Sequence, residues 1–264
     1  MKKALLRDSI KEIKNTYKRF ISILVMAFLG VGFFAGLRAA SPDMLDTIDK
    51  FYRDSQVFDI KILSTLGLTE SDIDALKNVD GVENVAGSYE VDGKIKLDKK
   101  EIITKLITVG DINKPILLDG NLPQNADECA VEESFLEANN KKIGDIIQVD
   151  VEKTKNDNGD EIEYLKNNQL KIVGTIQSPL YVSRDRGTSK LGNGKINYYM
   201  YISKDNINAN EIYTSIYVTA KTTEQTASTK YEDYIEQIKN NTLGIKIRNK
   251  YDKIKTRWRN KNGL

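Results

Sequence analysis

The chain has 264 residues, of which 40% are hydrophobic and 30% charged, and its formal net charge is +2. The first 40 residues carry eight basic and two acidic side chains, a net +6, which leaves about −4 for the remainder. The mildly acidic remainder argues against nucleic-acid binding. The chain has no histidine, so it lacks the commonest general base and the commonest zinc ligand. Cys129 is the single cysteine, which excludes an internal disulfide framework.

Residues 20–37 form an apolar stretch, FISILVMAFLGVGFFAGL, without any charged side chain. A helix of 18 residues is about 27 Å long, close to the roughly 30 Å hydrocarbon core of a bilayer. With its flanks, the predicted transmembrane helix covers residues 20–40. A buried core helix and a cleaved signal peptide are the alternatives; the 19-residue leader and the position of Arg38 argue against cleavage.

The charges on either side of the span predict its orientation. Seven basic residues precede it, whereas Arg38, Lys50 and Arg53 are the nearest basic residues that follow. The positive-inside rule therefore predicts a protein of the cell membrane, with a cytoplasmic N-terminus and the chain after about residue 40 extracellular. Residues 1–19 predict a cytoplasmic amphipathic helix, which lies on the inner membrane surface or docks a cytoplasmic partner.

Helical spacing of apolar residues continues after the span. Ser41, Pro42 and Asp43 are typical of a helix start, and Met44, Leu45, Ile48 and Phe51 then recur at helical spacing. The membrane helix is expected to continue, directly or after a break, into an extracellular helix over residues 41–55.

The next elements predict a split βαβ lobe formed by residues 56–110 and 206–247. A capping-box pattern, Thr69 with Asp72, predicts a short helix that Gly81 ends, and Asp92–Gly93 predicts a hairpin turn. The strand–helix–strand–strand order resembles half of a split βαβ unit. The other predicted elements are strands at Val57–Leu63, Val82–Val85, Tyr89–Val91, Lys94–Leu97, Ile102–Val109, Glu211–Ala220 and Leu243–Ile247, and a helix at Thr229–Asn240.

Turn signals become dense between these two parts, which predicts an inserted β-rich lobe over residues 111–205. The predicted fold class is therefore α+β: one N-terminal transmembrane helix, then a split βαβ lobe interrupted by a β-rich lobe. Residues 248–264 predict a basic helical segment, and the lack of a second span suggests part of a longer protein. The predicted strands of the insertion are Glu128–Val131, Ile146–Val151, Gln169–Ile176 and Ile196–Ile202, with a helix at Ser134–Asn139.

Motifs for chemistry are absent from the sequence. There is no phosphate-binding Gly-x-x-x-x-Gly-Lys-Ser/Thr loop, and a Ser-His-Asp triad is impossible without histidine. Asn156–Glu161 invites a calcium-loop interpretation, but Thr154 and Leu165 occupy the end positions that need acids, so a hairpin is favoured. A Ser-Lys pair stays open without any particular candidate. We therefore predict a non-enzyme with no catalytic, cofactor or metal-binding residues.

Two features could bind a ligand, and each has an ordinary structural explanation. Nine of the 13 tyrosines follow residue 180, including Tyr198, Tyr199 and Tyr201, which fits strand preference or an aromatic wall for a peptide or lipid. The basic loop Ser183–Lys195 is either a solvated tip or a contact for a partner or acidic ligand. Cys129 lies in a predicted strand, where a small core residue is expected.

Several stretches together resemble a known family. They are RDSIKEIKNTYKRFISILVMAFLGVGFFAGLRAASPDM, FDIKILSTLGLTESDIDALKNVDGVENV, LDGNLPQNADECAVEESFLEANNKKIGDIIQV and LKIVGTIQSPLYV. The last two follow the order of a Gly–Pro turn, a strand, a short helix, Lys-x-Gly-Asp and a strand ending in Val-Gly. Over most of residues 5–250 the chain resembles the membrane span and extracellular core domain of FtsX-like/MacB-type ABC transporter permeases of Gram-positive bacteria.

This resemblance implies a function without catalytic residues in this region. It implies further membrane spans, a dimer of permeases in the lipid bilayer and a separate cytoplasmic ABC-type ATPase subunit. The expected role is to couple cytoplasmic ATP hydrolysis to export, to lipid or lipoprotein handling, or to signalling by mechanotransmission through the helix over residues 20–55. The competing interpretation is a single-span membrane sensor or adhesion protein with an extracellular ligand-binding domain.

Overall fold

The structure, a computed structural model, describes residues 16–97, 100–155, 161–180, 186–208, 212–226 and 228–242. The chain divides into two units, Met1–Lys50 and Phe51–Leu264. The expected amphipathic helix over residues 1–19 lies mostly outside the described residues, and the basic segment 248–264 and the strand Leu243–Ile247 lie entirely outside them.

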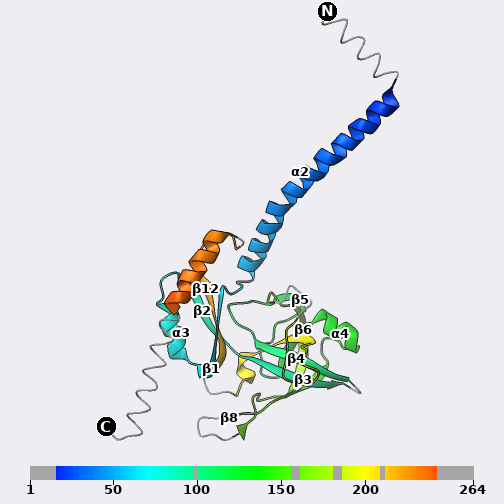
Figure 1. The fold of residues 1–264 in the computed structure, drawn as a ribbon. Helices are drawn as coiled ribbons and strands as arrows, with labels where there is room; N and C mark the ends of the chain where they lie inside the picture. Colours follow the sequence, from blue (N-terminus) through cyan, green and yellow to red (C-terminus); the bar gives the residue numbers. More distant parts are fainter. Residues whose placement is uncertain are drawn as a thin grey trace, which may run out of the picture. The chain divides into compact units, whose positions relative to one another are not determined.

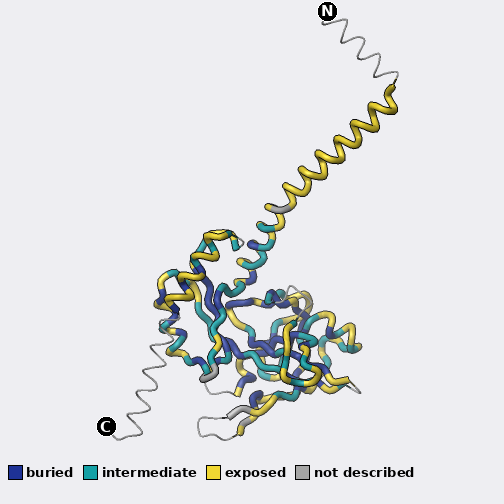
Figure 2. Tube along the Cα trace, viewed as in Figure 1, coloured by how far each residue is buried: buried dark blue, intermediate teal, exposed yellow. Residues whose placement is uncertain are grey.

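The first element described is α2 (Tyr17–Asp54), a single helix of 38 residues with Pro42 inside it. Its most apolar window has a mean hydropathy of 2.4 with no residue buried, and no other helix in the described part is long and apolar enough to cross a membrane. Figure 2 shows this exposure along the helix in yellow. Of the two expected continuations after residue 40, the direct one is present, so Ser41 does not begin a new helix.

A three-stranded sheet forms the first part of the second unit. Its strand order is β1-β12-β2, and β12 is antiparallel to both neighbours, so β1 and β2 run parallel with β12 between them. Since α3 connects β1 to β2, this is the predicted split βαβ arrangement (Figure 1). The elements are β1 (Ile60–Leu68), α3 (Glu70–Lys77), β2 (Val82–Ser88) and β12 (Tyr213–Ala220).

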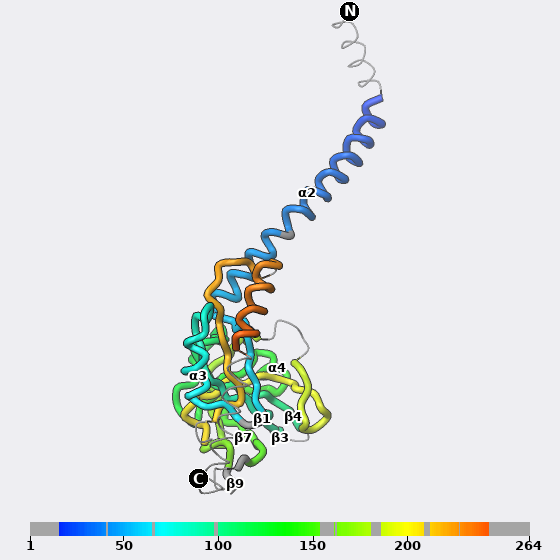
Figure 3. The backbone as a smooth tube through the Cα atoms, turned by 60° about the vertical axis from the view of Figure 1, so that its left-hand side comes forward, coloured from blue at the N-terminus to red at the C-terminus, as the bar shows by residue number. Residues whose placement is uncertain are grey.

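Two helices accompany this sheet. At the start of α3 the Asp72 carboxylate accepts hydrogen bonds from the backbone N–H and the hydroxyl of Thr69, at 2.8 and 2.9 Å, as the capping-box pattern predicts. Residues 229–242 form the second helix, which Figures 1 and 3 show in orange beside β12. Its Ile235 and Ile238 are buried, so one face of this helix packs into the core.

Seven strands form the second sheet, in the order β5-β10-β6-β11-β4-β3-β7. Because β7 also pairs with β10, six of the strands close into a barrel. The seventh strand, β5, pairs with the second half of β10, after the part that pairs with β7. The strands are β3 (Glu90–Leu97), β4 (Lys100–Thr108), β5 (Ile116–Gly120), β6 (Glu128–Glu132), β7 (Ile146–Val151), β10 (Gln169–Gln177) and β11 (Tyr198–Ile202).

Smaller elements join these strands. The helix α4 (Glu133–Asn139) follows β6, and the 3-10 turn η1 (Lys204–Asn206) follows β11. The short strands β8 (Thr154–Lys155) and β9 (Glu161–Ile162) pair antiparallel. These flanking strands fit the predicted hairpin, although residues 156–160 themselves lie outside the described residues.

Two expectations about β3 and β4 are wrong. Both strands belong to the barrel, where β3 pairs with β7 and β4 with β11, although residues 89–110 were expected in the first lobe. Asp92–Gly93 is not a turn, because both residues lie inside β3; the chain reverses between Leu97 and Lys100, which pair with each other. Gly93 has another role: a Cβ atom there would lie 2.5 Å from Leu106 Cδ1 and 2.7 Å from Val149 Cγ1.

A continuous apolar core joins the two sheets. One buried cluster includes Ile60 and Ile216 of the three-stranded sheet together with Leu106, Leu170 and Phe135 of the barrel part. A smaller cluster on the outside of the barrel contains Ile107, Ala130, Ile176, Ile196, Tyr199 and Tyr201.

Candidate functional site

Polar contacts gather where the end of α2 enters the second unit. Here residues 55–59 lie against the loop 111–114 between β4 and β5, and we call these two segments the helix junction. Lys114 N–H donates to the Ser55 carbonyl and Asn113 N–H to the Gln56 carbonyl, both at 2.9 Å. The Asn113 side-chain oxygen accepts the Phe58 N–H at 3.0 Å. The chain leaving α2 is therefore hydrogen-bonded to the β4–β5 loop through Ser55, Gln56 and Phe58.

The backbone at this junction is specialised. The Val57 N–H donates to the Tyr52 carbonyl and the Gln56 N–H to the Arg53 carbonyl, which is the Schellman pattern of helix ends. Gln56 has φ of 47°, in the left-handed region that this motif requires. Asn113 also has a positive φ of 60°, and only 3% of its surface is exposed. The junction thus combines a defined helix end with a buried asparagine.

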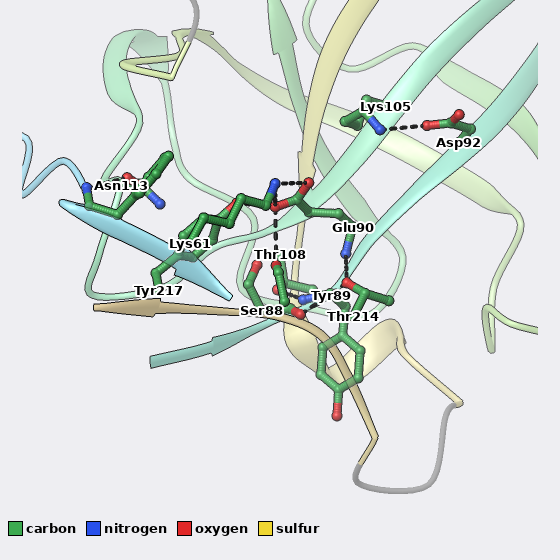
Figure 4. A network of polar contacts seen from close by, with 12 residues as sticks. Lys61, Ser88, Tyr89, Glu90, Asp92, Lys105, Thr108, Asn113, Thr214 and Tyr217 are labelled. Carbon is green, nitrogen blue, oxygen red and sulfur yellow. Dashed lines mark hydrogen bonds and ion pairs between the residues drawn. The ribbon is translucent and has the colours of Figure 1, made fainter. Parts of the chain in front are cut away.

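A largely buried carboxylate, that of Glu90, links the two sheets. Lys61 Nζ of β1 lies 2.8 Å from both carboxylate oxygens, and Ser215 Oγ of β12 donates at 3.1 Å. The Tyr217 hydroxyl also donates to it, and the Glu90 N–H donates to Thr214 Oγ1 at 2.7 Å. Figure 4 shows the labelled side chains of this network converging from β1, β3 and β12. Glu90 belongs to the barrel, so the network ties the barrel to the three-stranded sheet.

The electrostatic environment keeps Glu90 ionised. Burial alone would raise its pKa, but the Lys61 ammonium, hydrogen bonds from Lys61 and Tyr217, and nearby Lys105 together hold the pKa below its ordinary value of 4.5. The side chains of Lys61 and Glu90 are 27% and 10% exposed, so the ion pair is shielded from solvent.

This arrangement serves structure rather than catalysis. Ser215 and Lys61 both contact Glu90, but Ser215 is 0% exposed, so these two residues do not provide the Ser-Lys pair left open by the sequence. A nucleophile needs access to a substrate, and this hydroxyl has none. Within the described ranges, no group of three His, Cys, Asp or Glu side chains is placed to hold a metal ion.

The structure shows where the tyrosines of the possible aromatic wall lie. Tyr199 and Tyr201 are each 1% exposed and belong to the core, so an aromatic wall that includes them is wrong. Tyr198 is half-buried and, with Lys100, Glu101, Asn139 and Asn197, lines a depression of about 310 Å³.

The described part of the basic loop, from residue 186, is anchored through Arg186. Its guanidinium donates two hydrogen bonds, at 3.1 and 3.2 Å, to the Glu132 carboxylate. Arg184 lies outside the described residues. Arg186 therefore holds the loop against the barrel.

Cys129 is the small core residue that the sequence predicts. It lies in β6 with no exposed surface, and burial raises the pKa of its thiol well above the ordinary range. A neutral, inaccessible thiol is chemically inert.

Sequence reasoning missed both the helix junction and the Glu90 network. Asn113 lies in a short loop without a motif, and no local signal marks it as a bonding partner of residue 58. Glu90 meets Ser215, which is 125 residues further along the chain. Such pairings follow from the sheet order and have no counterpart in local periodicity.

Comparisons with known proteins found similarity to solved structures, two of which are extracytoplasmic domains. No family model and no curated protein matches the chain. Among solved structures, the extracellular domain of the noncanonic ABC-type transporter YknZ from Gram-positive bacteria is similar at a TM-score of 0.38 and 17% identity, covering 62% of this chain and 78% of that one. The periplasmic region of MacB from Actinobacillus actinomycetemcomitans is similar at a TM-score of 0.38 and 14% identity, covering 70% and 76%.

Proposed function

We propose that this chain is part of an ABC transporter permease subunit. In this proposal the apolar part of α2 crosses the membrane, the N-terminus is cytoplasmic, and Phe51–Leu264 forms the extracellular domain. The observation that carries the proposal is that α2 continues without a break from the exposed apolar segment to Asp54, and that the next residues, Ser55 and Gln56, are hydrogen-bonded to the β4–β5 loop.

Charge distribution supports the orientation. Seven basic residues precede residue 20, and the chain after residue 40 is net acidic. Under the positive-inside rule this arrangement keeps the leader in the cytoplasm. The sequence motifs that resemble MacB-type permeases begin in the same leader.

The proposed mechanism is transmission of force. The energy source is a separate cytoplasmic ATPase, which would move the membrane helices of a permease dimer. Movement of α2 would reach the second unit through Ser55 and Gln56, whose carbonyls are bonded to Lys114 and Asn113. The Lys61–Glu90 pair and its tyrosine and serine donors would then carry the strain from the three-stranded sheet to the barrel.

The first experiment is a pull-down of the full-length membrane protein in mild detergent. We expect an ABC-type ATPase subunit to co-purify and to be identified by mass spectrometry and ATP hydrolysis. A control transporter of known composition is solubilised in parallel. If the control keeps its ATPase and this protein brings none, the permease assignment is wrong, and the single-span sensor or adhesion protein becomes the favoured function.

A second experiment tests the mechanical part. A four-residue Gly-Ser insertion after Ala40 interrupts the helix with flexible residues. We expect it to abolish transport or signalling in the full-length permease, whereas an insertion of the same length made of alanine keeps the helix and retains more activity. Full activity with the flexible insertion would show that α2 does not transmit force.

A further inference from the structure

We propose that Asp59 is a positioning residue that couples the helix junction to the 229–242 helix. Its carboxylate is placed between β12 and that helix, and the residue follows directly on Phe58, which the junction holds. The functional meaning of this coupling rests on the proposed function, but its existence can be tested on the chain alone.

The first step is the set of contacts that Asp59 makes. One carboxylate oxygen accepts the Ala220 N–H at 2.6 Å, and the other accepts the hydroxyl of Tyr231. The Asp59 backbone N–H donates to the Val218 carbonyl at 2.9 Å. Asp59 is therefore fixed to β12 by its backbone and by one oxygen, and it uses the other oxygen to hold the first part of the 229–242 helix.

The second step is the connection towards α2. The neighbouring Phe58 donates its N–H to Asn113, and its ring lies on that of Tyr217, with centroids 5.0 Å apart. Consecutive residues are about 3.8 Å apart and joined by a planar peptide bond. A displacement of the junction that moves Phe58 must therefore also move the carboxylate of Asp59 or strain its bonds.

The third step is what else holds the 229–242 helix. Ile235 and Ile238 are buried in its middle, and the Tyr234 hydroxyl reaches the Lys221 carbonyl at 3.3 Å. The Tyr231 N–H donates to Ser228 Oγ at 3.2 Å, a bond within the same segment. These apolar contacts fix the middle of the helix. Tyr231 also packs against the core, and its bond to Asp59 adds a polar contact between the first part of the helix and the residue just before β1.

The chemistry favours aspartate at position 59. A carboxylate accepts hydrogen bonds on both oxygens, and bonds to a charged group are stronger than neutral ones. Asparagine has the same size, but its oxygen can accept the Ala220 N–H while its NH2 group donates to the Tyr231 hydroxyl oxygen, so Asp59→Asn would keep both contacts. Asp59→Ala removes both hydrogen bonds and, with them, the proposed coupling.

The first part of the test measures amide hydrogen exchange in the full chain, reconstituted in detergent micelles. We expect Asp59→Ala and Tyr231→Phe each to accelerate exchange in the 229–242 helix roughly tenfold, the effect of losing one hydrogen bond to a charged group. Tyr234→Phe is the matched control, because it removes a hydroxyl from the same helix without touching Asp59. We expect a change of only about twofold, the low end for a neutral hydrogen bond, since this one is exposed. Equal exchange in the Tyr231 and Tyr234 variants would overturn the proposal.

The second part is a double-mutant cycle between Asn113 and Asp59. If Asp59 had only a local structural role, the effects of the two substitutions would not depend on each other. Asn113→Gly keeps the positive φ and removes the oxygen that accepts the Phe58 N–H. Coupling through Asp59 predicts faster exchange in the 229–242 helix for Asn113→Gly in the wild-type background, and no further acceleration when Asp59→Ala is already present. Additive effects, or no effect of Asn113→Gly on that helix, would contradict the coupling.

A folding check keeps the test decisive. Protection of the buried Cys129 thiol reports that the core is intact in each variant. If Asp59→Ala does not fold, the same cycle is run with Tyr231→Phe, which leaves the Ala220 bond in place. No ATPase enters these measurements, so a failed pull-down would reject the proposed function without deciding the coupling.

Discussion

Among single residues, Glu90 offers a direct test of how its hydrogen-bonded ion pair contributes to stability. Its carboxylate is shielded from water and accepts bonds from Lys61, Ser215 and Tyr217. We expect Glu90→Gln to lower the free energy of unfolding by about 1–3 kcal/mol, because Lys61 loses its charged partner in a half-buried position. Denaturant unfolding of the full chain in micelles measures this. Asp74→Asn is the control, since its pair with Lys77 is exposed and is expected to matter by less than about 0.5 kcal/mol.

The pH dependence of stability has a predictable sign. Since the pKa of folded Glu90 lies below the ordinary 4.5, its ionised form stabilises the fold above that value. This contribution is lost as the pH falls through the lower pKa of the folded state. We expect the unfolding free energy to fall less steeply below pH 4.5 in Glu90→Gln than in the wild type. Parallel curves for the two proteins would show that Glu90 is not responsible for any acid sensitivity.

The single thiol offers a simple test of the core. Cys129 is buried with a raised pKa, so neither access nor thiolate is available in the native state. We expect no maleimide labelling of the folded chain over an hour and one label per chain in denaturant, measured by intact mass. Rapid labelling without denaturant would mean that β6 is not in the core.

Among the strands, the packing of β3 against its neighbours can be tested at Gly93. Its missing side chain leaves room for Leu106 and Val149, both of which are fully buried and cannot move aside freely. We expect Gly93→Ala to destabilise the fold by about 1–3 kcal/mol, in line with overpacked cores. Gly110→Ala is the matched control, because the nearest atom to its Cβ would be 3.9 Å away. Similar unfolding midpoints for both variants would contradict the close packing.

The elements differ in how far the sequence could predict them. Thr69 and Asp72 act within one helical turn, so the start of α3 follows from local chemistry. The turn expected at Asp92–Gly93 is absent because glycine is also found where neighbouring strands pack closely. Here the close packing comes from Leu106 and Val149, which lie on other strands. The assignment of β3 and β4 to the first lobe is wrong for a related reason. Nothing within residues 89–110 indicates that these strands pair with β7 or β11.

The site was less predictable than the fold. The apolar span and its flanking charges indicate where α2 lies, since both depend on composition alone. The helix junction depends on Asn113 meeting Phe58 over 55 positions, and the coupling residue on Asp59 meeting Tyr231 over 172. Hydrogen bonds of that range are set by the strand order, which puts β12 beside β1.

For the whole molecule, the apolar part of α2 predicts integral membrane association. Arginine at the centre of a span costs about 2.5–3.5 kcal/mol in insertion measurements, so Met26→Arg with Leu29→Arg should prevent insertion. Alkaline carbonate extraction of cell membranes checks this: the wild type stays in the pellet and the double variant moves to the soluble fraction. The control is Leu63→Arg, an exposed leucine in β1 outside the span, which should stay in the pellet.

The central position of β12 also constrains the order in which the protein can form during synthesis. β2 ends at Ser88 and β12 begins at Tyr213, so the ribosome adds roughly 125 residues before the middle strand exists. At a synthesis rate of about 5–20 residues per second, β1 and β2 lack the strand that pairs with both of them for about 6–25 seconds. A nascent chain stalled or cleaved within that window exposes two unpaired strand edges, which are the surfaces that recruit other chains into aggregates.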